Sequence, residues 1–273
     1  MRRSGNVLVC ALCGCMLAGV VLHAEVRRFE IGSEYLSGPE RIVVAWPDGD
    51  APVEGWPSLY LLNGYRDNEE AWPKRTPLDS LANVYSVVIV CPDGRDSFYW
   101  DVEDSVRAGL KMESFIVRDL VSHIDSIFPV DTLSRYIAGY SMGGHGALYL
   151  TARHPQLFHA AVSLSGALDI AHLKAYPWIK VPSLLGAYDQ QTWEGHAVFA
   201  HLDSLAAYSP RIMLACGDKD AFLPDNRRLH ADLGCRGVEH VFRILPGDHN
   251  WKFWRSQLPE LLEFVTNKSK NSL

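Results

Sequence analysis

The sequence lacks a surplus of positive charge. Its 273 residues include 26 Lys and Arg against 32 Asp and Glu, which gives a net charge of −6. Nucleic acids and anionic membranes are bound through clustered Lys and Arg side chains, so this balance argues against both as partners. With 48% hydrophobic and 21% charged residues, the composition is otherwise that of a globular protein. Chains of this length often form a single α/β domain, and we expect one here.

Cysteine is scarce. Six cysteines are present, and three of them lie within the first 24 residues: Cys10, Cys13 and Cys15. The other three are too few for the disulfide framework of a small secreted protein in a domain this large, although they leave room for one bridge. Two of them, Cys91 and Cys216, end apolar runs, where a buried free thiol behaves as a small hydrophobe. The third is Cys235.

A long hydrophobic run is also missing. The apolar run from Val7 to Leu22 has 16 residues, fewer than the roughly 20 that a membrane-spanning helix needs. A pair of arginines precedes this run and the small residue Ala24 follows it, an order typical of a secretory signal. We therefore expect a signal peptide over residues 1–24, cleaved after Ala24, and a secreted or periplasmic protein without stable membrane association. Two alternatives stay open, namely lipid attachment at Cys15 within LCGC and an uncleaved anchor.

The chain contains no internal repeats, low-complexity tracts or evident linkers between domains. Short, β-branched apolar runs recur instead, each closed by Gly, Pro or Asp, as in the buried strands of a parallel sheet. The predicted strands cover residues 58–64, 84–94, 135–141, 159–166, 211–218 and 239–249. Two further segments, 26–36 and 41–49, are predicted to pair as antiparallel strands around an SGPE turn.

Helical patterns lie between the predicted strands. They cover residues 113–129, 143–155, 223–234 and 253–268, and the first has an apolar stripe at three- and four-residue spacing. Alternating strands and helices imply βαβ units, with helices on both faces of one mostly parallel sheet. Residues 168–208 fit no simple alternation, and we expect them to form a helical insertion beside the functional site. The predicted α/β domain thus extends from residue 25 to residue 273.

One serine stands in a motif that carries chemistry. IAGYSMGGHG, residues 137–146, contains G-x-S-x-G between a predicted strand and a predicted helix. In this context the serine occupies a strained turn that projects its hydroxyl above the sheet, and side chains two positions away on either side would collide. Gly139 and Gly143 avoid that collision. The pattern predicts Ser141 as a nucleophile, against the alternative of a serine that only caps the helix.

A serine nucleophile needs a base and an acid that orients the base. With this serine turn, the acid and then the histidine follow in the sequence, on loops after later strands. His249 follows the last predicted strand and precedes the last helix, which is the position expected of the base. Three carboxylates follow the preceding predicted strand and compete for the role of the acid: Asp218, Asp220 and Asp225. Spacing alone leaves the choice open between Asp220 and Asp218.

Backbone amides are the expected stabilisers of the negative charge that develops on the carbonyl oxygen. One should be the amide of Met142, because this residue follows the nucleophile at the start of a helix. The other should come from the loop after an early strand, LLNGYRDNEEAW. Gly64 permits an unusual turn there, which would point the amide of Tyr65 at the site.

Five blocks carry a resemblance to a known group: YLLNGYRDNEEAW, PDGRDSFYWD, AGYSMGGHGALYL, CGDKDAFLPDN and GDHNWKFW. They resemble the putative esterase family of α/β-hydrolases, which includes esterase D (S-formylglutathione hydrolase), tributyrin-type acetyl esterases, feruloyl and acetylxylan esterases and mycolyltransferases. The resemblance covers residues 26–265 and implies the α/β-hydrolase fold, without a metal or organic cofactor. It implies Ser141 as nucleophile, His249 as base and Asp220 as acid, with the Tyr65 and Met142 amides as oxyanion donors. Asn63 departs from the family, since many relatives carry His there.

The resemblance and the predicted signal together favour a secreted serine esterase that hydrolyses acetyl or feruloyl-type esters on a small molecule or an oligosaccharide. Aromatic residues crowd the loops of the predicted site, and flat aromatic walls could bind a sugar ring or a cinnamoyl group. Trp100 and Trp251 are the aromatic residues expected to contact substrate. Two alternatives stay open: an acyltransferase with the same three residues, and a non-catalytic binding protein on an esterase scaffold.

Overall fold

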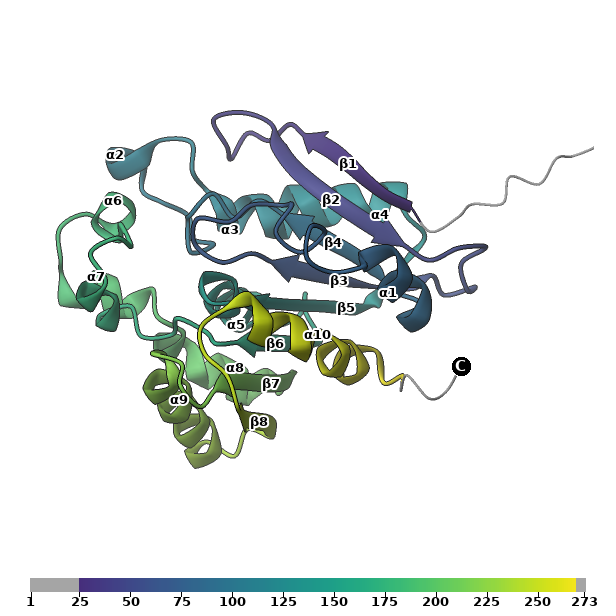
Figure 1. Cartoon of the computed structure of the whole chain (residues 1–273). Coiled ribbons are helices and arrows are strands. Elements are labelled where there is room, and N and C mark those ends of the chain that lie inside the picture. Colours follow the sequence, from purple (N-terminus) through teal and green to yellow (C-terminus); the bar gives the residue numbers. More distant parts are fainter. Residues whose placement is uncertain (1–24, 269–273) are drawn as a thin grey trace, which may run out of the picture.

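The computed structural model describes residues 25–268 (Figure 1). The predicted signal peptide at residues 1–24 lies outside the described residues. Within residues 25–268, no helix combines the length and the apolar character needed to cross a membrane. The cysteines of this part are free thiols, buried at Cys91 and Cys216 and exposed at Cys235.

One eight-stranded sheet forms the centre of the fold, with the strand order β1-β2-β4-β3-β5-β6-β7-β8. The first two neighbouring pairs, β1 with β2 and β2 with β4, are antiparallel, and the other neighbours are parallel. The mostly parallel sheet that the sequence predicts is therefore confirmed. The strands are β1 (Glu25–Ile31), β2 (Glu40–Trp46), β3 (Trp56–Leu62), β4 (Val88–Pro92), β5 (Val130–Tyr140), β6 (Ala160–Leu164), β7 (Arg211–Gly217) and β8 (His240–Leu245).

The sheet separates two hydrophobic cores, because neighbouring residues of a strand point to opposite faces. In β2, Ile42 and Val44 belong to one core, whereas Val43 and Ala45 belong to the other. The helices α1 (Leu78–Tyr85) and α10 (Trp251–Thr266) cover one face. The opposite face packs against α4 (Val121–Ile127), α5 (Met142–Arg153), α8 (Leu202–Tyr208) and α9 (Leu223–Cys235).

Two helical segments differ from the prediction. The stripe at 113–129 forms α3 (Met112–Ser114), a π-helical segment (Phe115–Leu120) and α4 in succession, rather than one regular helix. Helix α1 is not predicted from the sequence, where its last residues fall within an expected strand. The burial of Leu78, Ala82 and Tyr85 nevertheless follows a helical period. Ser86, with φ 48°, ends α1 before β4 begins.

The expected helical insertion is present. Between β6 and α8 the chain forms short helical pieces: η2 (His172–Ala175), α6 (Pro182–Leu185), α7 (Gln190–Gly195) and η3 (Val198–His201). In Figure 1, α6 and α7 lie beyond one end of the sheet, on the same side as α2 (Asp104–Arg107). Residues of this insertion line the cavity that contains Ser141.

Candidate active site

Ser141 lies in a sharp turn between β5 and α5. Its backbone has φ 55° and ψ −118°, a conformation that residues other than glycine rarely adopt. A Cβ atom on Gly139 would lie 2.5 Å from the carbonyl carbon of Gly143. A Cβ atom on Gly143 would lie 2.7 Å from the carbonyl oxygens of Leu62 and Asn63. The turn therefore needs glycine at both positions, as the sequence predicts.

Three side chains that the sequence predicts to act together meet at this turn. Nε2 of His249 lies 3.0 Å from Oγ of Ser141. On the other side of the imidazole, Nδ1 lies 3.1 and 3.0 Å from the two carboxylate oxygens of Asp220. Both sets of distances are within hydrogen-bonding range for a nucleophile, a base and an orienting acid. The loops after β5, β7 and β8 thus bring together residues that are far apart in the sequence.

Asp220 is buried and held in its ionised form. Burial, the largest single influence, would raise the pKa of its carboxyl, but the hydrogen bond and the charge of His249, together with further hydrogen bonds to the carboxylate, hold that pKa below its ordinary value. The amide of Phe222 adds a further hydrogen bond to Oδ1, at 2.9 Å. The Asp220 side chain is 0% exposed, whereas the His249 side chain is 25% exposed and can reach a bound molecule.

The other two carboxylates considered for the acid have different partners. Oδ1 of Asp218 accepts a hydrogen bond from the amide of Gly247 at 2.9 Å, which closes a turn between two loops. Oδ2 of Asp225 lies 2.8 Å from Nδ1 of His172, a residue of the insertion. Spacing left the identity of the acid open between Asp218 and Asp220. The geometry favours Asp220, because it is the carboxylate in contact with His249.

Of the two residues expected to supply oxyanion amides, Met142 directly follows Ser141 and Tyr65 lines the same cavity. Met142 is the first residue of α5, so its amide has no acceptor within the helix. Tyr65 lines the same cavity as Ser141 and follows β3 in a turn closed by the Asp67 amide on the Gly64 carbonyl, at 3.2 Å. No larger residue fits at Gly64, because a Cβ atom there would lie 2.5 Å from the ring of Tyr140.

Asn63 supports this turn from below. Its Oδ1 accepts hydrogen bonds from the amide of Gly94 at 2.9 Å and from the hydroxyl of Tyr99 at 3.0 Å. Its Nδ2 donates to the carbonyl of Gly64 at 3.0 Å. The buried amide side chain thus joins the loop after β3 to the loop after β4. Asparagine, which stands here where many relatives carry histidine, therefore holds the turn through the hydrogen bonds of its side chain.

The side chains around Ser141 line a cavity of about 580 Å³, here called the Ser141 cavity. Trp251, expected to contact substrate, is part of its wall, next to Trp254 and His249. The expectation for Trp100 is wrong. Its side chain is 0% exposed, stacked on Phe98 and packed against His145 and His196 in the core, because the loop after β4 folds inward.

Several residues of the cavity wall were not predicted from the sequence. Oδ2 of Asp67 accepts hydrogen bonds from the hydroxyl of Tyr140 at 2.6 Å and from the indole of Trp251 at 3.2 Å. The sequence signal that could have identified Asp67 as a residue of the site is its position in the loop after β3, which was already expected to supply an oxyanion donor. Tyr176, Trp178 and Ile179 come from the insertion, for which the sequence indicates only a position beside the site.

The fold and this arrangement define the class of the protein as an α/β-hydrolase of the serine-hydrolase type. The model of the family described as "Putative esterase" matches residues 33–265, so the chain belongs to this family. It is an enzyme that hydrolyses carboxylic esters. Among curated relatives, an acetyl esterase of Caldicellulosiruptor saccharolyticus is 28% identical over 239 residues, covering 81% of this chain and 87% of the relative.

Solved structures share the fold. A fluorophosphonate-binding serine hydrolase of Staphylococcus aureus superposes with a TM-score of 0.81 at 22% identity, covering 90% of this chain and 99% of the other. A ferulic acid esterase superposes with a TM-score of 0.77 at 24% identity, covering 90% and 98%. The α/β-hydrolase fold expected from the sequence is confirmed by these neighbours.

Proposed function

We propose that this protein is a secreted serine carboxylesterase that hydrolyses acetyl or feruloyl-type esters carried by a carbohydrate, through Ser141, His249 and Asp220. The observation that carries the proposal is the pair of contacts at about 3.0 Å on the two nitrogens of His249. One nitrogen faces the hydroxyl of Ser141 and the other faces a buried, ionised carboxylate. This is the arrangement that turns a serine hydroxyl into a nucleophile.

The first half of the reaction acylates Ser141. His249 takes the proton of the hydroxyl at Nε2 while Oγ attacks the ester carbonyl carbon. Asp220 holds the tautomer with Nδ1 protonated and stabilises the imidazolium that forms. The tetrahedral oxyanion is held by the amides of Tyr65 and Met142. As the intermediate collapses, the bond to the alcohol breaks and His249 returns its proton to the leaving oxygen.

The second half releases the acid. A water molecule takes the place of the alcohol, loses a proton to Nε2 of His249 and attacks the acyl carbonyl. The second oxyanion rests on the same two amides. When it collapses, the bond to Oγ breaks, the proton returns to Ser141 and the carboxylic acid leaves. The net reaction consumes one water and yields an alcohol and an acid, with no other reactant.

The size and walls of the Ser141 cavity support the substrate class. Its volume of about 580 Å³ exceeds what an acetyl group alone requires, and its aromatic walls suit a sugar ring or a phenolic acyl group. The acetyl esterase relative and the ferulic acid esterase neighbour support the same two acyl groups. The polar groups at the wall, Asp67 and Arg66, suit the hydroxyls of a sugar.

Secretion rests on the sequence of residues 1–24, where arginines, an apolar run and Ala24 follow in the order of a signal peptide. Mass spectrometry of the protein recovered from the medium or periplasm of an expressing bacterium tests it. We expect a chain that begins at Glu25. A lipid-modified Cys15 at the N-terminus, or an intact segment 1–24 in the membrane fraction, would contradict this part of the proposal.

Parallel hydrolysis of acetylxylan, methyl ferulate and tributyrin tests the substrate class. We expect the wild-type protein to hydrolyse at least one of the first two at a kcat/KM about tenfold or more above tributyrin, consistent with about 1.4 kcal/mol of selective binding. Ser141→Ala serves as the inactive control. Equally weak rates on all three would overturn the carbohydrate-ester hypothesis. A transesterified product formed with an added alcohol, in preference to hydrolysis, would favour the acyltransferase alternative.

A further inference from the structure

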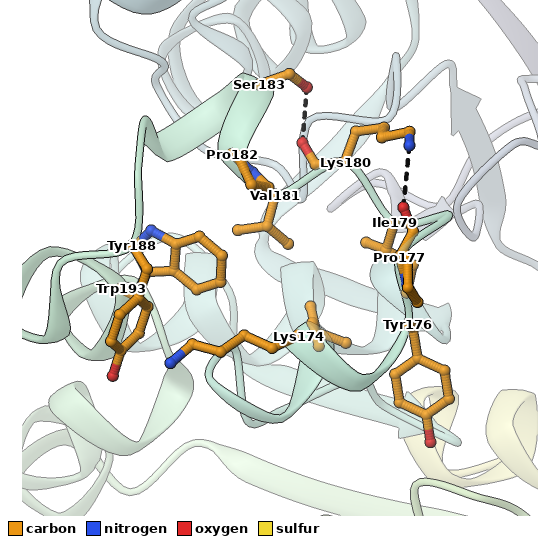
Figure 2. Close-up of a pocket in the computed structure, with 11 residues that line it drawn as sticks. Lys174, Tyr176, Pro177, Ile179, Lys180, Val181, Pro182, Ser183, Tyr188 and Trp193 are labelled. Atoms are coloured by element: carbon orange, nitrogen blue, oxygen red, sulfur yellow. Dashed lines mark hydrogen bonds between the residues drawn. The ribbon is translucent and has the colours of Figure 1, made fainter.

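A second cavity, of about 570 Å³, lies within the helical insertion beside the Ser141 cavity (Figure 2). We call it the insertion cavity. Its wall is formed by η2, α6, the segment between them, and Tyr188 and Trp193 at α7. Tyr176 and Ile179 line both cavities, so these two side chains form the partition between them. A ligand that extends past this partition from Ser141 would enter the insertion cavity.

The wall of the insertion cavity is largely apolar and flat. Leu173, Val181 and Trp193 are almost fully buried and form its floor. Tyr188 packs edge-on against Trp193 at a centroid distance of 5.1 Å and is 47% exposed, so it adds aromatic surface at the edge of the cavity. Pro177 adds further flat surface. Such a wall packs well against the face of an aromatic ring.

The charge at the rim is of one sign. Of the residues that the structure describes, two lysines and no acidic residue line the cavity, although acidic residues outnumber basic ones in the chain, 32 to 26. Nζ of Lys174 lies 2.8 Å from the centroid of the Tyr188 ring, and Nζ of Lys180 donates a hydrogen bond to the Pro177 carbonyl at 3.0 Å. Within residues 25–268, neither ammonium forms an ion pair. Figure 2 shows the Lys174 side chain extended along the cavity.

We propose that the insertion cavity is a second subsite, which binds an aromatic ring that carries a carboxylate. The apolar wall takes the ring, and the ammonium of Lys174 takes the carboxylate. The role of this subsite in catalysis rests on the proposed esterase function: the ring that it binds would belong to the part of the substrate remote from the scissile bond. The backbone amide of Lys180 donates to the hydroxyl of Tyr65 at 3.1 Å, so the subsite adjoins the expected oxyanion turn.

Binding to the inactive Ser141→Ala protein tests this subsite without turnover. Isothermal titration calorimetry would compare naphthoate with naphthylmethanol, a neutral molecule of nearly the same shape. We expect naphthoate to bind about fivefold or more tightly, as for one charge contact near the surface. Lys174→Met on this background should remove most of that preference. Lys268→Met, which removes an exposed lysine just after α10, should retain it.

A second variant separates this cavity from the Ser141 cavity. Ser183 is an exposed residue of the insertion cavity, so Ser183→Trp should block the cavity without disturbing the core, and naphthoate binding should be lost. Equal binding of both molecules, or binding of naphthoate that survives both Lys174→Met and Ser183→Trp, would overturn the inference. Neither result bears on ester hydrolysis, which is measured separately with the wild-type protein and p-nitrophenyl acetate.

Discussion

Oδ2 of Asp225 lies 2.8 Å from Nδ1 of His172, and this pair joins the start of α9 to the helical insertion. Burial raises the pKa of Asp225, while the neighbouring His172 opposes that rise. The pKa of Asp220, five residues earlier, is instead held below its ordinary value by His249 despite burial. Two aspartates close together in the sequence thus have different roles: one fastens the insertion, and the other faces the histidine beside Ser141.

The two aspartates should respond differently to the same substitution. We expect Asp220→Asn to lower kcat on p-nitrophenyl acetate by about 10³ to 10⁴, because the amide favours the wrong tautomer of His249. Asp225→Asn should lower kcat by less than about tenfold, since it weakens only the attachment of the insertion. Steady-state kinetics of both variants checks this. A larger loss for Asp225→Asn than for Asp220→Asn would mean that Asp220 is not the acid.

The serine turn should not tolerate a methyl group at Gly139. Because the added Cβ would lie 2.5 Å from the Gly143 backbone, we expect Gly139→Ala to lower the free energy of unfolding by roughly 1–3 kcal/mol and to reduce activity. Gly234→Ala is the matched control, since a Cβ atom added at this position of α9 would meet no atom within 4 Å. That variant should be neutral or more stable by up to about 1 kcal/mol. Urea denaturation of both proteins measures the difference.

Trp100 and Trp251 should separate stability from substrate binding. Trp100→Phe removes part of a fully buried ring, so we expect roughly 1–2 kcal/mol of lost stability and an unchanged KM. Trp251→Phe removes the hydrogen bond to Asp67 at the cavity wall, and we expect KM for methyl ferulate to rise about fivefold. Thermal unfolding and kinetics on both variants provide the check. A raised KM for Trp100→Phe at unchanged stability would contradict the packing described for the loop after β4.

His145 should make the fold sensitive to mild acid. It is fully buried in α5 with Nε2 3.0 Å from the His196 carbonyl, and burial lowers its pKa to about 3. The neutral form is favoured by folding, so its contribution to stability is complete above the unfolded pKa of about 6.5 and declines as the pH falls below it, by about 1.4 kcal/mol per pH unit.

The difference between wild type and His145→Gln isolates this contribution. Glutamine has no charge to gain, and its amide can still donate to the His196 carbonyl. Urea unfolding at pH 7.5 and at about pH 5.5 should therefore show a smaller loss of stability for His145→Gln than for wild type, by roughly 1 kcal/mol. Equal losses for the two proteins would mean that His145 is protonated, or exposed to solvent, in the folded state.

The sequence predicts the sheet and the turn that contains Ser141 because both depend on local patterns. Buried strands give short apolar runs, and the serine turn requires glycine at 139 and 143 whatever the rest of the chain does. Spacing did not separate Asp220 from Asp218, because both lie within reach of the loop after β8. The partners of those carboxylates, His249 and the Gly247 amide, are set by tertiary contacts.

Other features could not be predicted from local patterns. Trp100 has a polar indole nitrogen and lies in a loop after a strand, as a residue of a binding loop would. The loop after β4 nevertheless folds inward and packs this side chain against α5. Helix α1 has eight residues and only a short apolar stripe. Its last residues are apolar or aromatic and lie just before the apolar run of β4, so the sequence pattern assigned both to one strand. The insertion is held by distant pairs such as His172 with Asp225, which leave no periodic signal.

The role of Ser141 as the nucleophile is best tested by labelling with a fluorophosphonate probe, followed by peptide mass spectrometry. We expect one probe adduct, located on Ser141 and absent from Ser141→Ala. Labelling should be slowed by at least about a hundredfold in His249→Ala, because the imidazole is needed to take the proton. Labelling at another serine, or labelling of Ser141 at an undiminished rate in His249→Ala, would contradict this assignment.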